Sequence, residues 1–76
     1  MSEYDPYDMA LIGKIIKIEK NTALVDFNGI KRDIELGLVE AKEGDYILVH
    51  AGYAIKVIDE KDMTDNIRKI INKLNE

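Results

Sequence analysis

Side chains that could carry out chemistry are scarce in this sequence. His50 is the only histidine among 76 residues, and the chain contains no cysteine. An imidazole can act as a general base near neutral pH, but nucleophilic catalysis also requires a hydroxyl or thiol beside it and a third group that orients the base. The hydroxyl residues Ser2, Thr22 and Thr64 fall in a terminus, a turn and the start of a predicted helix. We therefore predict that the protein is not an enzyme.

The capacity to bind a metal is equally limited. His50 is the only candidate ligand of its type, and a lone imidazole without a second ligand residue is not a metal site of its own. Asp26 and Asp33 can be drawn as a carboxylate pair on one hairpin, but charge on the wet face of a sheet explains them better. Two interpretations of His50 stay open: a structural imidazole, hydrogen-bonded at a strand end, and a residue that contacts another protein.

Short strands must position this histidine. Five runs rich in β-branched and aromatic residues, bounded by turn residues, predict strands over 11–19, 22–27, 30–36, 46–50 and 53–58. Asn28-Gly29 lies between the second and third runs and is the strongest short-range signal for a type I′ hairpin. Gly13, inside the first run, indicates a bulge or a close backbone approach. In the fourth run, His50 shares one face with Tyr46 and Leu48.

The third run alternates between polar and mostly apolar positions. Ile30, Ile34 and Leu36 predict one largely buried face, and Arg32 is the exception on it. The period changes from Asp59 onward, where one apolar stripe at helical spacing is made by Met63, Ile67, Ile70, Ile71 and Leu74. We expect this stripe to pack across the sheet, with docking of a partner on part of it as the alternative.

These elements predict an all-β small barrel of the OB-like type, with about five strands and a C-terminal α-helix. The expected organisation is a flexible N-terminal extension over 1–9, the β-barrel over 10–58, and a C-terminal helix packed on the barrel over 59–76.

Composition and charge limit the classes of partner that the protein could bind. The 11 Lys and Arg residues are dispersed among 15 Asp and Glu residues, whereas nucleic-acid binding requires clustered cations and aromatic platforms. The acidic start of the chain does not resemble a signal peptide, and no apolar run is long enough to span a bilayer. We predict a cytoplasmic protein that binds neither nucleic acid nor membrane.

The stretch GDYILVHAGYAI, residues 44–55, resembles the signature of the HypC/HupF family, small chaperones of [NiFe]-hydrogenase maturation. The stretch GKIIKIEKNTALVDFNGIKRDIELGLV, residues 13–39, is similar to the family's preceding segments, so the resemblance covers roughly residues 10–58. It implies an accessory chaperone that binds a HypD-like maturation protein, on which the iron fragment is assembled, and the precursor of the hydrogenase large subunit.

The start of the chain departs from this family. Members begin with a cysteine, which holds the iron fragment and engages partners; here Ala10, Gly13 and Lys14 match, but Asp8 takes the cysteine position and Ile12 a proline position. A carboxylate is a poor ligand for low-spin iron that carries cyanide and carbon monoxide, because such iron favours soft sulfur donors. We therefore expect no stably bound cofactor and at most a transient iron fragment.

The resemblance also implies a set of partner-binding residues: Asp8, Met9, Ala10, Gly13, His50, Gly52 and Tyr53, with His50 as the one candidate contact to iron. A cysteine-free paralogue that serves another metalloenzyme or a regulatory role is the first alternative. A single-stranded nucleic-acid binder is a weaker one, and its affinity would fall steeply with salt.

Overall fold

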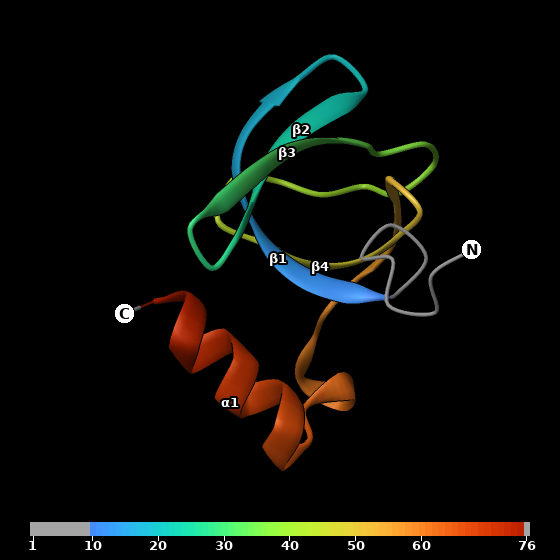
Figure 1. Cartoon of the computed structure of the whole chain (residues 1–76). Helices are drawn as coiled ribbons and strands as arrows, with labels where there is room; N and C mark the ends of the chain where they lie inside the picture. The colour runs from blue at the N-terminus through green and yellow to red at the C-terminus, as the bar shows by residue number, and fades with distance from the viewer. Residues whose placement is uncertain (1–9, 76) are drawn as a thin grey trace, which may run out of the picture.

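The structure is a computed structural model, and it describes residues 10–75. Five strands, a short 3-10 turn and one helix follow one another along the chain (Figure 1): β1 Leu11–Glu19, β2 Thr22–Phe27, β3 Ile30–Glu35, β4 Tyr46–His50, β5 Tyr53–Val57, η1 Glu60–Asp62 and α1 Asp65–Leu74. The strands close into a barrel in the order β1-β2-β3-β5-β4. The predicted small five-stranded barrel with a C-terminal helix is confirmed.

Strand β1 is the common member of the barrel, because it pairs antiparallel with β2 on one side and with β4 on the other. The hairpins β2–β3 and β4–β5 complete the antiparallel pairings. Between β3 and β5 the ladder consists of one parallel pair, Glu35 with Tyr53, supported by a 3.0 Å hydrogen bond from the Glu35 amide to the Gly52 carbonyl. This pair closes the barrel.

Alternation along the strands builds a small aliphatic core. Every second side chain of a strand points to the same face, and Ile47 and Val49 on β4 accordingly point inward with 0% and 4% of their surface exposed. The inner cluster holds Ile15, Ala23, Val25, Ile34, Leu36, Ile47 and Val49. Tyr46, Leu48 and His50 share the opposite face of β4, as predicted, and this face is the outer surface of the barrel.

Gly13 lies inside the barrel, where a side chain would have no room. A β-carbon built on it would lie 2.3 Å from Cγ1 of Val25 and 2.7 Å from the ring of Phe27. The predicted close approach at Gly13 is therefore confirmed. The bulge of β1 lies three residues later instead: the register shifts between Ile15 and Lys17, which lets Ile15 and Ile18 both point inward.

The third strand is more exposed than the sequence predicts. Only Ile34 and Leu36 of its apolar positions are buried, whereas Ile30 is 58% exposed and Arg32 is exposed too. The predicted largely buried face is thus wrong for the first half of β3, because β5 pairs with β3 only at Glu35 and covers nothing further back along the strand.

The C-terminal helix is shorter than predicted. Asp59 caps the 3-10 turn with its side chain, and the backbone then becomes extended at Met63 and Thr64. Thr64 starts a second helical segment, because its hydroxyl oxygen accepts a hydrogen bond from the amide of Ile67 at 3.2 Å. The prediction of one continuous helix from Asp59 is wrong, and Met63 does not belong to the stripe of α1.

Helix α1 packs on the outside of the barrel, below β1 and β4 in Figure 1. Ile71 is its one buried residue. At its C-terminal end the side chain of Asn75 accepts a hydrogen bond from Lys14 Nζ (3.2 Å) and donates one to the phenol oxygen of Tyr46 (2.6 Å). The apolar contact and these two hydrogen bonds fix the position of the helix over the first and fourth strands.

Candidate partner-binding rim

The β1–β4 ladder brings two distant parts of the chain together. Leu11 pairs with Val49 and Ile12 with Leu48. Continued by one residue, the same register sets Ala10 opposite His50. The start of the barrel and the end of β4, which lie far apart in the sequence, are therefore neighbours at one end of the barrel.

The β4–β5 hairpin completes this site. His50 pairs with Tyr53, and the two turn residues between them both have positive φ, 52° at Ala51 and 83° at Gly52. Positive values at both central positions define the tight turn that matches the twist of the strands. Because paired residues project to the same side of a sheet, the imidazole and the phenol both face outward.

We call Ala10, His50, Gly52 and Tyr53 the signature rim. Ala10 and His50 are exposed, Gly52 is half-buried, and Tyr53 exposes 59% of its surface. An exposed aromatic ring and an imidazole that can donate and accept hydrogen bonds are typical of a surface that binds protein. Gly52 lacks a side chain and so lets another backbone approach closely.

The structure gives no support to a structural role for the imidazole. His50 is exposed, and no hydrogen bond joins its side chain to any other residue among 10–75. Within those residues no three His, Cys, Asp or Glu side chains are grouped as a metal site would require. Contact of His50 with an iron fragment therefore stays a prediction, and it would need ligands from outside the described part of the chain.

The predicted site residues are only partly brought together. Ala10, His50, Gly52 and Tyr53 meet at the rim. Gly13 is buried and its packing against Val25 and Phe27 explains it fully, so its contact with a partner stays a prediction. Asp8 and Met9, together with the predicted extension over 1–9, lie outside the described residues.

Sequence reasoning missed an apolar groove next to the rim. It lies between the barrel and α1 and measures about 500 Å³. Its lining comes from four places in the chain: Ala10, Leu11 and Ile12; Phe27 and Asn28; Leu48; and Ile67, Ile70, Lys73 and Leu74. Ile70 exposes 43% of its surface here although it belongs to the apolar stripe of the helix.

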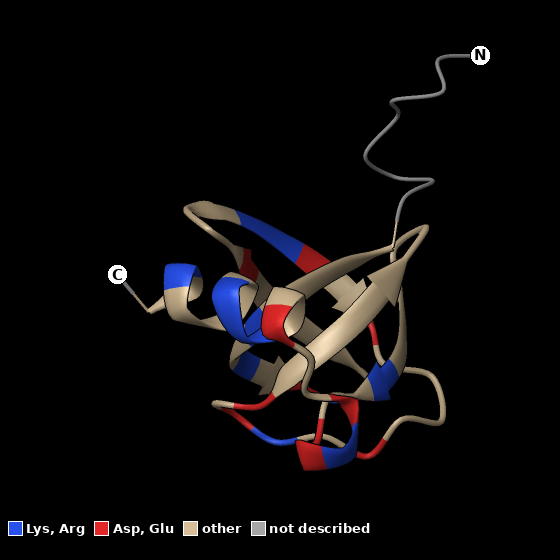
Figure 2. Cartoon of the chain, turned by 90° about the horizontal axis from the view of Figure 1, so that it is seen from below, with Lys and Arg blue, Asp and Glu red and all other residues tan. Residues whose placement is uncertain are grey.

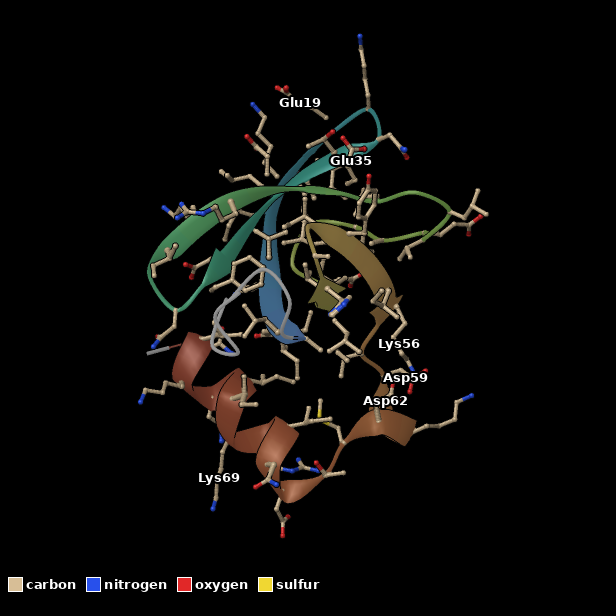
Figure 3. All side chains as sticks on the ribbon, turned by 45° about the vertical axis from the view of Figure 1, so that its right-hand side comes forward. Glu19, Glu35, Lys56, Asp59, Asp62 and Lys69 are labelled. Atoms are coloured by element: carbon tan, nitrogen blue, oxygen red, sulfur yellow. The ribbon has the colours of Figure 1, made fainter. Side chains whose placement is uncertain are left out.

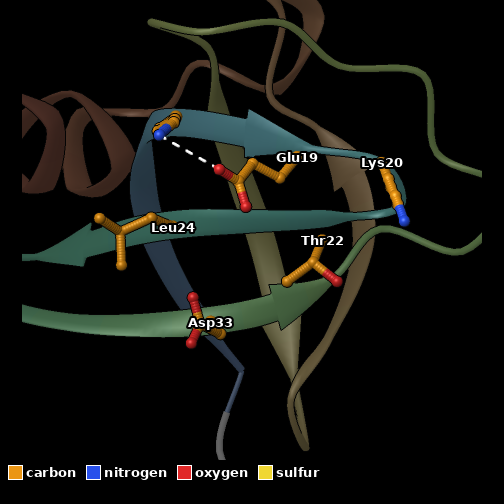
Figure 4. Close-up of a pocket in the computed structure, with 6 residues that line it drawn as sticks. Glu19, Lys20, Thr22, Leu24 and Asp33 are labelled. Carbon is orange, nitrogen blue, oxygen red and sulfur yellow. Dashed lines mark ion pairs between the residues drawn. The ribbon is translucent and has the colours of Figure 1, made fainter.

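A second hollow lies on the outer face of β1, β2 and β3 (Figure 4). It measures about 790 Å³ and is lined by Lys17, Glu19, Lys20, Thr22, Leu24 and Asp33. Lys17 and Glu19 form a 3.2 Å ion pair there, with 63% and 75% of their side chains exposed. Water screens such a pair, and the side chains of this hollow do not converge on a common point. It carries no function in our interpretation.

Charge does not gather into a binding surface for nucleic acid. Acidic and basic residues are interspersed over the barrel and the helix (Figure 2). In residues 10–75, neither helical segment has the length and hydrophobicity needed to span a bilayer. What the geometry offers is a small barrel with a partly aromatic rim that contains His50, bordered by an apolar groove. This combination defines a class of small barrels suited to binding other proteins.

Comparison with known proteins gives the family. Residues 9–70 match the model of the HupF/HypC family. The chain is 37% identical over 67 residues to the hydrogenase maturation factor HypC of Escherichia coli strain K12, a match that covers 79% of this chain and 74% of that protein. It is 40% identical over 60 residues to the protein of the same name from Synechocystis sp. strain PCC 6803, covering 70% of this chain and 79% of the relative. The chain belongs to the HupF/HypC family of hydrogenase maturation factors.

Proposed function

We propose that this protein is an accessory chaperone of [NiFe]-hydrogenase maturation, which acts by binding a HypD-like maturation protein and the precursor of the hydrogenase large subunit. The observation that carries the proposal is the register of β1 and β4. It joins the start of the barrel at Ala10 to His50 and Tyr53, so that the segment at the family's N-terminal position and the signature stretch 44–55 form one surface.

The chemistry of the rim suits recognition between proteins. Tyr53 offers a large ring with a polar tip, the kind of side chain that contributes most to binding energy at interfaces. His50 lies beside it and can donate or accept a hydrogen bond. The rim itself contains no Lys, Arg, Asp or Glu, and the exposed carboxylate of Glu35 lies next to it, because Glu35 pairs with Tyr53.

Carriage of the iron fragment is a separate matter, because no thiolate is available. The chain has no cysteine, and Asp8 takes the position of the family cysteine. A hard carboxylate oxygen is a weak ligand for low-spin iron with cyanide and carbonyl ligands. We therefore infer that this protein binds the assembly partners while the iron fragment stays on the partner, and that it turns over no substrate itself.

Binding to purified HypD-like protein tests the proposal. His50→Ala and Tyr53→Ala should each weaken binding by about tenfold or more, equal to about 1.4 kcal/mol. Lys31→Ala is the matched control, because Lys31 is exposed on β3 and lies outside the rim. Equal affinities of all three variants and the parent would exclude the rim as the binding surface.

The second candidate function is that of a cysteine-free paralogue that keeps the barrel and the rim but serves another metalloenzyme or a regulatory role. The replacement of the family cysteine by Asp8 favours it. Co-purification from the source cell separates the two: retention of a HypD-like protein or a large-subunit precursor supports the first function, and retention of neither, with His50 intact, supports the second.

A further inference from the structure

The β2–β3 turn contains two neighbouring residues that can react with each other. Asn28 is followed directly by Gly29, and both residues are exposed. The backbone nitrogen of the glycine can attack the side-chain carbonyl carbon of the asparagine, because the new bond closes a five-membered ring and glycine has no side chain to hinder the approach. The turn lies at the end of the hairpin opposite Glu35 (Figure 3), open to water.

The reaction converts the side-chain amide into a carboxylate. The Gly29 nitrogen forms a bond to Cγ of Asn28, the bond from Cγ to Nδ2 breaks, and the proton of the nitrogen leaves with the Nδ2 group as ammonia. Water then opens the succinimide ring. Opening at Cγ gives aspartate, and opening at the main-chain carbonyl carbon gives isoaspartate, in which the main chain runs through Cγ. Water is the one co-reactant, so the conformation of the turn sets the rate.

A carboxylate holds the nitrogen that would attack. The Gly29 amide donates a 2.8 Å hydrogen bond to Oδ1 of Asp26. Attack requires this nitrogen to give up its proton, and a deprotonated nitrogen beside a carboxylate places two negative charges together. Ring closure also requires the amide to turn away from its present acceptor, so the hydrogen bond must break first. Asp26 therefore opposes the reaction in two ways.

We propose that Asn28 is a site of spontaneous deamidation and that Asp26 keeps it intact while the hairpin is folded. The backbone of the turn contributes to the protection, since φ of 60° at Asn28 and 100° at Gly29 belong to the tight turn that the two strands hold in place. Loss of the Asp26 contact, or of the hairpin, exposes the site to reaction. The inference concerns the chemical lifetime of the chain and goes beyond the proposed function.

Deamidation would change both the hairpin and the groove beside α1. Isoaspartate adds a carbon atom to the main chain of the turn that sets Phe27 opposite Ile30, and Phe27 packs against the core. Asn28 also belongs to the lining of the groove, together with Lys73, so the product places a new carboxylate in that lining. The modified protein should therefore differ from the parent in stability and in charge.

The β4–β5 turn provides a comparison within the same molecule. Its central residues, Ala51 and Gly52, have φ of 52° and 83°, in the same left-handed region as the central residues of the β2–β3 turn. Val49, which has no carboxylate, stands three positions before Gly52, whereas Asp26 has that position before Gly29. The substitution Ala51→Asn therefore creates the same reactive pair in a similar turn without the protecting group.

Peptide mass spectrometry tests the proposal on the purified full-length protein, incubated at mildly alkaline pH. The rate at which a side-chain NH2 becomes OH is measured at each asparagine. Asp26→Ala should accelerate the reaction of Asn28 about tenfold, a difference of about 1.4 kcal/mol in the barrier, and Asp26→Asn, which keeps a neutral acceptor, should give an intermediate rate. Asp33→Ala, the matched removal of an exposed carboxylate from β3, should leave the rate unchanged. In Ala51→Asn, position 51 should react about tenfold faster than Asn28.

Hydrogen exchange of the β2 and β3 amides separates the loss of the Asp26 contact from unfolding of the hairpin. The proposal requires Asn28 to react faster in Asp26→Ala while these amides stay protected. Acceleration that appears only together with loss of amide protection would assign the effect to unfolding and overturn the role of Asp26. An unchanged or slower rate in Asp26→Ala, or equal rates at Asn28 and position 51 in Ala51→Asn, would also overturn it. In the parent, Asn28 should react faster in urea than in the folded protein, and equal rates there would show that the fold gives no protection.

Discussion

The side-chain amide of Asn75 donates a 2.6 Å hydrogen bond to the phenol oxygen of Tyr46, and this contact fastens the last turn of α1 to the fourth strand. The same side chain accepts from Lys14, whose ammonium lies 5.9 Å from the centre of the Tyr46 ring. Lys14 of β1, Tyr46 of β4 and Asn75 at the end of the helix thus form one cluster that holds the helix on the barrel. Apart from it, the helix is anchored mainly by Ile71.

Tyr46→Phe should loosen the helix and leave the barrel intact. The change keeps the ring but removes the acceptor of the Asn75 hydrogen bond, a loss of about 0.5–1.5 kcal/mol. Hydrogen exchange of the α1 amides should accelerate, while that of the amides of β2 stays the same. Uniform acceleration across the chain would mean that helix and barrel unfold together.

Gly13→Ala should destabilise the barrel by about 1–3 kcal/mol, the usual cost of overpacking. The new methyl group would lie 2.3 Å from Cγ1 of Val25, and urea denaturation measures the loss. Val25→Ala removes that clash, so the double variant should be less destabilised than the sum of the two single ones. Strict additivity would show that the methyl group finds room elsewhere.

Ala51→Asn should stabilise the protein by about 0.5–1 kcal/mol. Ala51 has φ of 52°, a left-handed conformation that costs most L-residues about 1–2 kcal/mol and that Asn adopts more readily. The β2–β3 turn already carries an Asn at the corresponding position, with φ of 60° at Asn28 and 100° at Gly29. Thermal unfolding measures the gain, and Ala51→Val, a β-branched control, should lower the melting temperature.

The surface pair Lys56–Asp62 should make a small, pH-dependent contribution to stability. The hydrogen bond from Lys56, 2.6 Å long, and a second from the Asp59 amide lower the pKa of the Asp62 carboxyl below its ordinary 3.8. A lowered folded-state pKa stabilises the protein above pH 3.8, and the contribution is lost as the pH falls through the folded-state value.

Asp62→Asn should therefore reduce the melting temperature slightly at pH 6, and the difference from the parent should shrink as the pH is lowered below about 4. The effect is small because Lys56 is exposed and Asp62 is only half-buried, so water screens the pair. A difference that stays constant down to the lowest pH at which the protein folds would assign the effect of Asp62 to its backbone capping contact alone.

Restoring the family's first residues should permit carriage of the iron fragment. The change consists of deleting residues 1–6 and introducing Tyr7→Met and Asp8→Cys, with Ile12→Pro as a further step. When partners are co-expressed, the altered protein should show cyanide and carbonyl infrared bands that the parent lacks, since a thiolate suits such iron. Bands already present in the parent would show that another group, with His50 the first candidate, holds the fragment.

Local sequence signals predicted most of the barrel. Asn28-Gly29 located the β2–β3 turn, and the alternation of Ile47 and Val49 with Leu48 and His50 gave the inner and outer faces of β4. Of the two possibilities predicted at Gly13, a bulge or a close approach, the close approach is confirmed. The bulge between Ile15 and Lys17 is signalled by the spacing of Ile15 and Ile18, three residues apart on one inner face.

The helix and the site were predicted less well. Thr64 is a favoured N-cap residue, but the apolar Met63 before it fits the helical stripe and so hides the break. Only the capping contacts show that η1 begins after Asp59 and α1 after Thr64. The meeting of Ala10 with His50 depends on register between strands far apart in sequence, and the groove depends on how α1 lies across them. Neither is a local property, so the pattern of residues alone could not reveal them.

Because β1 pairs with both β2 and β4, the complete signature rim depends on a contact between segments that lie far apart along the chain. The hairpins β2–β3 and β4–β5 close short loops, whereas the pairing of Leu11 with Val49 must close a loop across most of the barrel, and such long-range contacts form slowly. A chain that holds both hairpins but not this ladder keeps His50, Gly52 and Tyr53 together and lacks Ala10 beside them. The complete rim therefore exists only in molecules whose barrel has closed.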